Sequence, residues 1–293
     1  MSKKASRIAK NEYQKEFIKI FDSICGRHSR YEVFQDFVFL TAIEFSNAVD
    51  HERREARNRT YASIARKYEK PELEKMASML GWVVLGMEAN PDQDFLGELY
   101  MNLDLGNPHA GQFFTPYDVC KCMSKMLYAD VKQQIEEKHW ISCSDPTCGA
   151  GALLVAFANH CRDCGVNYQR SVLFVCQDID LTVGLMCYIQ LSLMGCAGYV
   201  VVANSITNPA VGLDDRGLIP IEKEGQDIWF TPMYFSDVWH WRRVWALVDL
   251  QCRQIAKPTR NPETTTPATD TEMEQSDAGQ LTFFRKEQSQ WTA

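Results

Sequence analysis

The sequence has no apolar run long enough to span a membrane, and its first residues lack the apolar core of a signal peptide. A spanning helix needs about 18 consecutive apolar residues, but the most apolar stretch, residues 183–195, is shorter and contains Gln190 and Ser192. The chain starts Met-Ser-Lys-Lys-Ala-Ser-Arg, which is too polar for a secretion signal. We therefore expect a cytoplasmic protein without a membrane partner.

Metal ligands at the spacing of a structural zinc site are also missing. Eleven cysteines are present, and without a secretion signal they are expected to be reduced thiols. Cys161 and Cys164, preceded by His160, form half of a zinc-site pattern, but no second pair lies at a suitable spacing. We expect these thiols to pack between helices, and we predict no metal.

The chain lacks the excess of positive charge that marks a protein coating DNA. It carries 31 Lys and Arg against 38 Asp and Glu, a net charge of −7. Residues 1–30 are an exception, with eight basic and three acidic side chains, so a local phosphate contact is allowed there. The hydrophobic fraction of 45% and the charged fraction of 24% exclude a fully disordered chain, a collagen and a coiled-coil rod.

The character of the sequence changes twice, which divides the chain into three parts. Residues 1–105 show apolar side chains at helical spacing, and we expect a helical region. Residues 106–256 alternate short apolar runs, glycine-containing turns and helical patterns, as in an α/β domain. Residues 257–293 lack a core-forming pattern and should be a disordered tail.

A strand–loop–helix pattern lies between residues 139 and 165. A short strand at 139–144 leads into Asp145-Pro-Thr-Cys-Gly-Ala-Gly151, and an apolar helix starts at Ala152. The two glycines let a ligand approach the backbone closely, and the helix directs free N–H groups toward that ligand. The pattern indicates a ligand-binding loop, although a simple tight turn explains it too.

Two further strands end in polar residues. The strand at 171–176 is followed by Asp178, about 30 residues after the glycine loop, where nucleotide-binding folds place the acid that binds a ribose. Asp178 is also a candidate helix cap, but Asp180 fits that role better because the next apolar helix starts at Leu181. The third strand ends at Asn204.

Upstream, residues 111–118 have the composition of a helix start. Thr115 is the expected N-cap, Pro116 the first helical residue and Asp118 the capping-box acid. We expect this helix to bury one apolar stripe, formed by Val119, Met123, Met126 and Leu127.

The order of these features resembles the adenine-specific DNA methyltransferases, and most closely the modification subunits of type I restriction systems. Gly-Gln-Phe-Phe-Thr-Pro, followed about 30 residues later by Asp-Pro-Thr-Cys-Gly-Ala-Gly, carries the resemblance, which covers roughly residues 94–205. It implies a Rossmann-like methyltransferase fold that depends on S-adenosylmethionine.

The resemblance also implies roles for residues by position. In that family the Thr-Pro helix start and the glycine loop surround S-adenosylmethionine, the second-strand acid holds the ribose, and the end of the third strand meets the adenine ring. Carried over, the cofactor-binding residues are Thr115, Pro116, Asp145, Thr147, Gly149, Gly151, Asp178 and Asn204. Asn204 departs from the family, in which Asp is common at this position.

The family's catalytic tetrapeptide, Asn/Asp/Ser-Pro-Pro-Tyr/Phe, does not occur. In the family it accepts hydrogen bonds from the target amino group and stacks an aromatic ring on the flipped base. The preferred substitute follows an apolar strand and provides Thr231, Pro232 and Tyr234 as catalytic residues. The alternative, Asn208-Pro209-Ala210, has a better first residue but no aromatic residue and no strand before it.

The part of the chain after Thr231 is short. We expect one helix there, then the tail, so the sheet should be truncated to about four strands. Aromatic residues near this point either stack on bases or, as is more usual, form core. They are Trp229, Tyr234, Phe235, Trp239 and Trp241.

Two functions follow as hypotheses. The first is a DNA adenine-N6 methyltransferase, which aligns the reactants and accepts hydrogen bonds from the amino group. The second is a catalytically inactive, S-adenosylmethionine-binding module associated with DNA. No target-recognition region is visible, so a specificity subunit or another protein would supply it, in restriction-modification or in another methylation system.

The tail carries Gln280-Leu-Thr-Phe-Phe284 near its end. This segment resembles the Gln-Leu-x-Leu-Phe motif with which bacterial proteins bind the DNA sliding clamp, with Phe283 where leucine is usual. Such a tether would raise the local concentration of the protein at DNA. Alternatively, Leu281 and Phe284 pack on the protein's own core.

Overall fold

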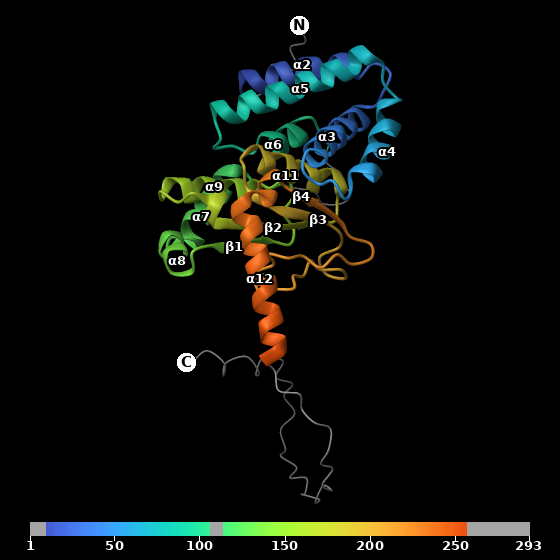
Figure 1. Ribbon diagram of the computed structural model, residues 1–293. Coiled ribbons are helices and arrows are strands. Elements are labelled where there is room, and N and C mark those ends of the chain that lie inside the picture. The colour runs from blue at the N-terminus through green and yellow to red at the C-terminus, as the bar shows by residue number, and fades with distance from the viewer. Residues whose placement is uncertain (1–9, 106–113, 257–293) are drawn as a thin grey trace, which may run out of the picture. The chain divides into compact units, whose positions relative to one another are not determined.

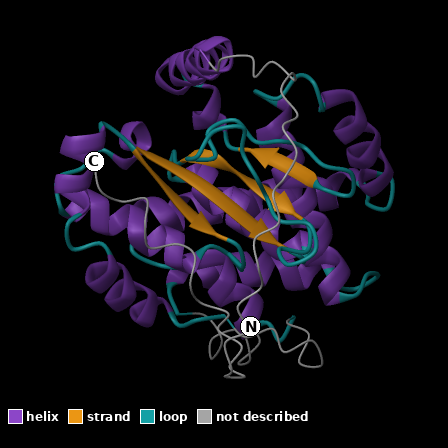
Figure 2. Ribbon diagram, turned by 90° about the horizontal axis from the view of Figure 1, so that it is seen from below, coloured by secondary structure: helices purple, strands orange, loops and turns teal. Residues whose placement is uncertain are grey.

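The computed structural model describes residues 10–105 and 114–256, and the described residues up to Arg253 belong to one compact unit. In this unit, helices surround a four-stranded sheet (Figures 1 and 2). The expected α/β class is confirmed, and the strand number matches the expected truncated sheet. The predicted disordered tail, residues 257–293, lies outside the described residues.

The first part of the chain is helical, as expected. Asn11, Ser29 and Asp94 cap three of its helices by accepting hydrogen bonds from first-turn N–H groups, which otherwise lack partners. Buried side chains of these helices share one hydrophobic cluster with those of the following part, and the domain boundary at residue 106 stays a prediction. The helices are α2 (Glu12–Ile24), α3 (Arg30–Asn47), α4 (Arg54–Ala65), α5 (Lys70–Ala89) and α6 (Phe95–Asn102).

The second part of the chain alternates helices and strands. Two local predictions are confirmed: an apolar helix starts at Ala152, and Asp180 caps α11 by accepting a hydrogen bond from the N–H of Val183. The elements are α7 (Tyr117–Leu127), α8 (Val131–Lys138), β1 (Ile141–Asp145), α9 (Ala152–Asp163), α10 (Tyr168–Ser171), β2 (Val172–Asp178), α11 (Leu181–Leu193), β3 (Ala197–Val202), β4 (Asp227–Phe230), the 3₁₀ helix η2 (Pro232–Phe235) and α12 (Asp237–Ala256).

The strands lie in the order β1-β2-β3-β4. The first three are parallel, with Asp145 paired to Cys176 and Asp178 to Val202. Their last residues therefore meet at one end of the sheet, which we call the carboxyl end. β4 is antiparallel to β3, so β4 finishes at the opposite end.

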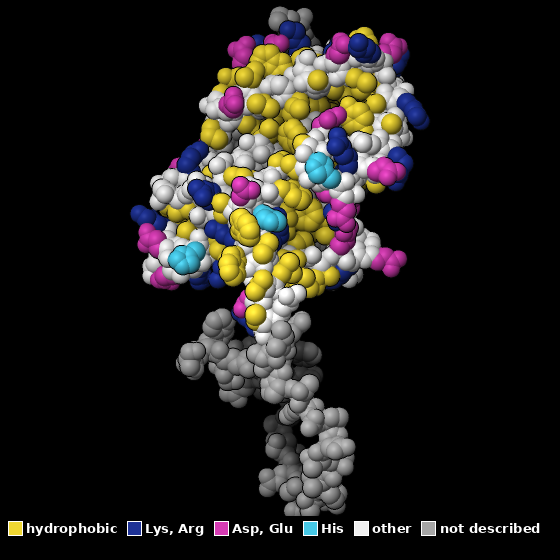
Figure 3. All heavy atoms as spheres, in the orientation of Figure 1, with side chains coloured by type: hydrophobic (Ala, Val, Ile, Leu, Met, Phe, Trp, Pro, Cys, Tyr) yellow, Lys and Arg dark blue, Asp and Glu magenta, His cyan; other side chains and the backbone are white. Residues whose placement is uncertain are grey.

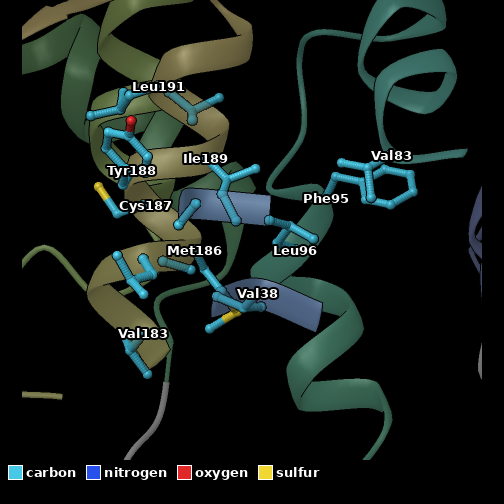
Figure 4. Packing of buried hydrophobic residues seen from close by; sticks show 14 of the residues in the cluster. Val38, Val83, Phe95, Leu96, Val183, Met186, Cys187, Tyr188, Ile189 and Leu191 are labelled. Atoms are coloured by element: carbon cyan, nitrogen blue, oxygen red, sulfur yellow. The ribbon is translucent and has the colours of Figure 1, made fainter. Parts of the chain in front are cut away.

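Helix α11 occupies the centre of the main hydrophobic core. Figure 4 shows its Met186 and Ile189 beside Val38 of α3 and Leu96 of α6. Most side chains of α11 are buried, as expected for a helix that is apolar all round. A second cluster covers the other face of the sheet, so both faces are packed. It includes Leu173, Tyr199, Val201, Leu218, Tyr234 and Trp239.

The aromatic residues near β4 divide between core and surface. Trp229, Tyr234 and Trp239 are buried, which agrees with the core interpretation. Phe235 is 37% exposed and Trp241 is 59% exposed, so these two rings are available at the surface.

The apolar stripe expected to be buried on α7 is exposed instead. The helix packs on α9 and buries Tyr117, Cys120 and Ser124. An amphipathic pattern shows which side chains share a face, but the neighbouring element decides which face is covered. The exposed residues are Val119, Met123, Met126 and Leu127.

The start of α7 also differs from the prediction. Pro116 occupies the N-cap position, and no side chain makes a capping hydrogen bond there. Thr115 is therefore not the cap. Pro116 precedes the helix rather than opening it, and Asp118 contributes only an acid in the first turn, where the helix dipole favours it.

Within the described ranges, no helix is long and apolar enough to cross a membrane. The same residues contain no group of His, Cys, Asp and Glu side chains that could hold a metal ion. None of the eleven cysteines forms a disulfide. Cys161 is buried, and Sγ of Cys164 lies 3.7 Å from Nε2 of His160.

Candidate functional site

The glycine loop after β1 is shaped by backbone conformations that favour glycine. Gly149 has a φ of 57° and Gly151 a φ of 94°. A Cβ atom on Gly151 would lie 2.9 Å from Sγ of Cys187. The loop therefore needs glycine at residue 151 for both conformation and space.

Asp178, at the end of β2, holds this loop. Its Oδ2 accepts a hydrogen bond from the N–H of Gly149 and its Oδ1 accepts one from the N–H of Asp180, each at 2.9 Å. Burial raises the pKa of the Asp178 carboxyl group, and the two backbone bonds oppose that rise. A carboxylate has about four acceptor positions, so these bonds leave capacity for ligand hydroxyl groups.

Asp145 lies at the end of β1, next to Asp178. Its Oδ1 accepts a hydrogen bond from the N–H of Thr147 at 3.1 Å. Burial raises the pKa of Asp145; the bond from Thr147 lowers it, and the charge of Asp178 adds to the rise. The raised pKa means that the ionised form of Asp145 is disfavoured. A bound cation would oppose this effect, because opposite charge favours the ionised form.

A cavity of about 210 Å³ opens beside the loop. Four of the predicted cofactor-binding residues line it together, from two parts of the chain: Thr115, before α7, and Asp145, Thr147 and Gly149, at the end of β1 and in the loop after it. Residues of the first turn of α9 form another part of its wall. The remaining lining residues are Asp94, Phe114, Cys120, Cys148, Ala150, Ala152 and Leu153.

A larger cavity of about 480 Å³ adjoins the first, because Asp94, Phe114 and Thr115 line both. Pro116 lies in its wall, together with residues of the N-terminal helices. Its volume falls within the range of roughly 300–1,000 Å³ that is typical of small-molecule sites. The two cavities together offer room for a nucleoside-sized ligand.

Gly151, Asp178 and Asn204 are not lining residues of these two cavities. Gly151 and Asp178 instead determine the loop conformation. Oδ1 of Asn204 accepts hydrogen bonds from the N–H groups of Ile206 and Thr207 at 2.9 and 3.2 Å, which stabilises the turn after β3.

Asp94 was missed by the sequence reasoning and lies where the two cavities meet. It is 3% exposed, and its Oδ1 accepts hydrogen bonds from the N–H of Gly97 at 3.0 Å and from Nε2 of Gln190 at 2.8 Å. Burial raises its pKa to about 6. An acid three residues before Gly97 at a helix start is an N-cap signal, but that signal does not reveal the cavity.

The predicted catalytic residue Thr231 lies far from the glycine loop. It follows β4 at the opposite end of the sheet, beside the start of β3. Its hydroxyl group is fully buried, donates to the carbonyl oxygen of Cys196 at 2.7 Å and accepts from the N–H of Gly198 at 3.0 Å. The side chain therefore joins β3 to β4.

Pro232 and Tyr234 share this position. Pro232 opens η2, and the buried Tyr234 donates its hydroxyl hydrogen to the carbonyl oxygen of Leu218 at 2.8 Å. The structure does not bring Thr231, Pro232 and Tyr234 to the cavity: Tyr234 belongs to the second hydrophobic cluster, and Thr231 is fully buried. Their catalytic role stays a prediction that this placement does not support. Because β4 is antiparallel to β3, it finishes at the end of the sheet opposite the glycine loop, and the residues that follow it are distant from the cavity.

The alternative motif, Asn208-Pro209-Ala210, lies at the carboxyl end. The carbonyl oxygen of Asn208 accepts a hydrogen bond from Nε2 of Gln177, near the end of β2, at 2.9 Å. Its Nδ2 donates to the carbonyl oxygen of Glu224 at 3.0 Å. Of the two candidate motifs, this one shares an end of the sheet with the glycine loop.

Comparison with known proteins gives one match. The family model described as N-6 DNA methylase matches residues 92–263, which include Asp94, α7 and the glycine loop. No curated protein and no solved structure matches the chain significantly. The matched segment covers more than half of the sequence, and it contains Asp94, Phe114 and Thr115, which line both cavities. The chain therefore belongs to the N-6 DNA methylase family.

Proposed function

We propose that the chain is a DNA adenine-N6 methyltransferase that uses S-adenosylmethionine. The observation that carries the proposal is the meeting of Thr115, Asp145, Thr147 and Gly149 around one cavity at the carboxyl end of the sheet. Open α/β sheets bind ligands outside the carboxyl ends of their strands. The parallel β1, β2 and β3 support a Rossmann-like methyltransferase fold.

The chemistry of the cavity wall suits the charged groups of this cofactor. The first turn of α9 offers N–H groups and the positive end of a helix dipole, which favour a carboxylate. Asp94 and Asp145 offer carboxyl groups whose raised pKa would fall beside an ammonium or sulfonium group. When bound, S-adenosylmethionine supplies an electrophilic methyl group.

The other predicted residues at the carboxyl end would bind and orient the cofactor. Asp178 would accept hydrogen bonds from ribose hydroxyl groups while keeping its bonds to the loop. Asn204 would lie near the adenine ring. We propose DNA as the substrate and a separate specificity protein as the partner that supplies target recognition, since the described residues up to Arg253 form one compact unit.

One observation favours a second function, an inactive module that binds cofactor and DNA. Thr231 and Tyr234 are buried at the end of the sheet opposite the cavity, which argues against a role for this pair at a bound base. Of the two candidate motifs, the Asn208 motif would then accept hydrogen bonds from the target amino group, and it lacks the aromatic residue.

A labelled-methyl assay distinguishes the two functions. The full chain is incubated with tritiated S-adenosylmethionine and adenine-containing duplex DNA, and the DNA is digested to nucleosides. We expect label in N6-methyldeoxyadenosine, and its loss in Asp145→Ala. Calorimetric cofactor binding without label on any DNA would support the inactive module, and absence of both would reject the cofactor assignment.

A further inference from the structure

Helix α7 presents an apolar surface to solvent, which we call the α7 stripe. Met126 is 76% exposed and Leu127 is 62% exposed. Spacings of three, four and seven residues place the members on one side of the helix. A surface helix normally turns its apolar side to the core. The α7 stripe consists of Val119, Cys122, Met123, Met126 and Leu127.

The other side of α7 is firmly attached to the protein. Tyr117 donates its hydroxyl hydrogen to Oδ1 of Asp92 at 2.9 Å, and Lys121 forms an ion pair with the same carboxylate. The orientation of the helix is therefore determined by these contacts and by Cys120 and Ser124. Nothing in the described parts of the chain covers the α7 stripe, and contiguous exposed apolar side chains mark interaction surfaces.

Two charges beside the stripe indicate what covers it. Asp118 and Lys125 are seven residues apart, so they lie two turns apart along the same flank of the helix. Lys121 is paired with Asp92; among the described residues Asp118 and Lys125 form no ion pair of their own, and the charge of Asp118 acts only as a neighbour that raises the pKa of Lys121. The flank thus carries a negative charge near one end and a positive charge near the other.

We propose that the α7 stripe pairs with the α7 stripe of a second copy of this chain, with the two helices antiparallel around a two-fold axis. In this arrangement Asp118 of each copy lies opposite Lys125 of the other, and both charges gain a partner. In a parallel two-fold pair the charged flanks of the two copies would lie on opposite sides of the helix pair, so neither charge would gain a partner. A two-fold interface is self-complementary by construction, and this inference is independent of the proposed function.

Helix α12 also exposes apolar side chains, but its charged residues do not point to pairing with a second copy. Hydrophobic side chains lie along the visible side of α12 (Figure 3), and Trp241, Trp245 and Val248 of this helix are exposed. Asp249 of this helix is paired with Arg253 at 2.8 Å. Arg242 and Arg243 donate to backbone carbonyl oxygens.

Cys122 makes the arrangement testable, because it lies almost midway between Asp118 and Lys125. The two-fold axis would pass close to it, bringing the Cys122 thiols of the two copies near each other. The side chain is exposed. A bismaleimide with a two-carbon spacer would join the two thiols through two thioether bonds.

The first experiment treats the full chain with this reagent and analyses it on a denaturing gel. We expect a covalent dimer in the natural chain and in Cys252→Ala, which removes the exposed thiol of α12. Cys122→Ala should lose the dimer band. A band that survives in Cys122→Ala, or that depends on Cys252, would overturn the proposal.

The second experiment measures mass by light scattering after size-exclusion chromatography. We expect a dimer for the natural chain and for the control Trp245→Glu, and a monomer for Met126→Glu. Asp118→Lys should weaken association about two- to fivefold for each lost pair, and Asp118→Lys combined with Lys125→Asp should restore it. A monomeric natural chain would assign the stripe to a different protein. A dimer that persists in Met126→Glu would assign dimerisation to another surface.

Discussion

The two ends of the sheet carry similar polar side chains and use them differently. At the carboxyl end, Asp145 and Thr147 line a cavity beside a glycine loop. At the opposite end, the hydroxyl groups of Thr231 and Tyr234 are buried and bonded to backbone carbonyl oxygens. A polar residue followed by proline and an aromatic ring is therefore a site only where a cavity adjoins it, and elsewhere it is core.

The largest expected effect is on the free energy of unfolding, and it concerns Tyr234 at the end of the sheet opposite the cavity. Tyr234→Ala removes a ring stacked on Phe230 at a centroid distance of 4.8 Å, and it should lower the free energy of unfolding by about 3–5 kcal/mol. Tyr234→Phe keeps the ring and should cost about 1 kcal/mol, because only the bond to Leu218 is lost. Urea denaturation measures both. Loss of methyl transfer at unchanged stability would show that Tyr234 is catalytic after all.

A smaller effect concerns the pH dependence of stability at the cavity. Folding raises the pKa of Asp94 from 3.8 to about 6, so the protonated form is favoured in the folded state. The stabilising contribution is present below pH 3.8 and is lost as the pH rises through about 6, by up to about 3 kcal/mol.

The matched variant is Asp94→Asn, which cannot ionise but can still accept hydrogen bonds from Gly97 and Gln190. It should lack this pH dependence and be more stable than the natural chain at pH 7. Thermal unfolding between pH 4 and 7 measures the difference. Parallel stability curves for the two proteins would show that Asp94 titrates normally.

Substitutions at the carboxyl end should change the affinity for the cofactor, whereas substitutions at the opposite end should not. Asp178→Ala removes the proposed ribose acceptor and the hydrogen bond to Gly149 of the loop, and it should weaken S-adenosylmethionine binding by about 1–3 kcal/mol. Tyr234→Phe is the control at the opposite end and should bind normally. Titration calorimetry showing equal affinity for the natural chain and Asp178→Ala would remove the ribose role.

The smallest effect is expected for Thr231→Ser. This change keeps the hydroxyl group that bonds to Cys196 and Gly198, and it removes one buried methyl group, which costs about 1 kcal/mol. Methyl transfer per folded molecule should be unchanged, whereas Asn208→Ala should reduce it. The opposite pattern would place the catalytic motif at the end of β4.

Several features of the fold followed from local sequence alone. The glycine loop, the helix start at Ala152 and the cap at Asp180 each depend on residues within a few positions of one another. Glycine conformations, caps and apolar periods are local physics, so these predictions needed no partner elements. The helical character of residues before 105 followed for the same reason.

The residues of the candidate site could be predicted only in part from local sequence. Thr115 and Asp145 could be named from motifs, but their common cavity depends on how α7 packs on α9. Asp94 could not be found as a site residue, because its pattern is that of an ordinary cap. Its role at the cavity arises from Gln190, which is distant in sequence and donates a hydrogen bond to it.

The sequence by itself determined where the chain forms strands, helices and the glycine loop, since those choices are decided by neighbours along the backbone. Only the tertiary structure decided the direction of β4 and the covered face of α7. Strand direction depends on pairing with β3, and the buried face of α7 depends on its contacts with α9 and Asp92. Those contacts join residues far apart in the chain, so periodicity alone could not show that Thr231 is core and that Met126 is surface.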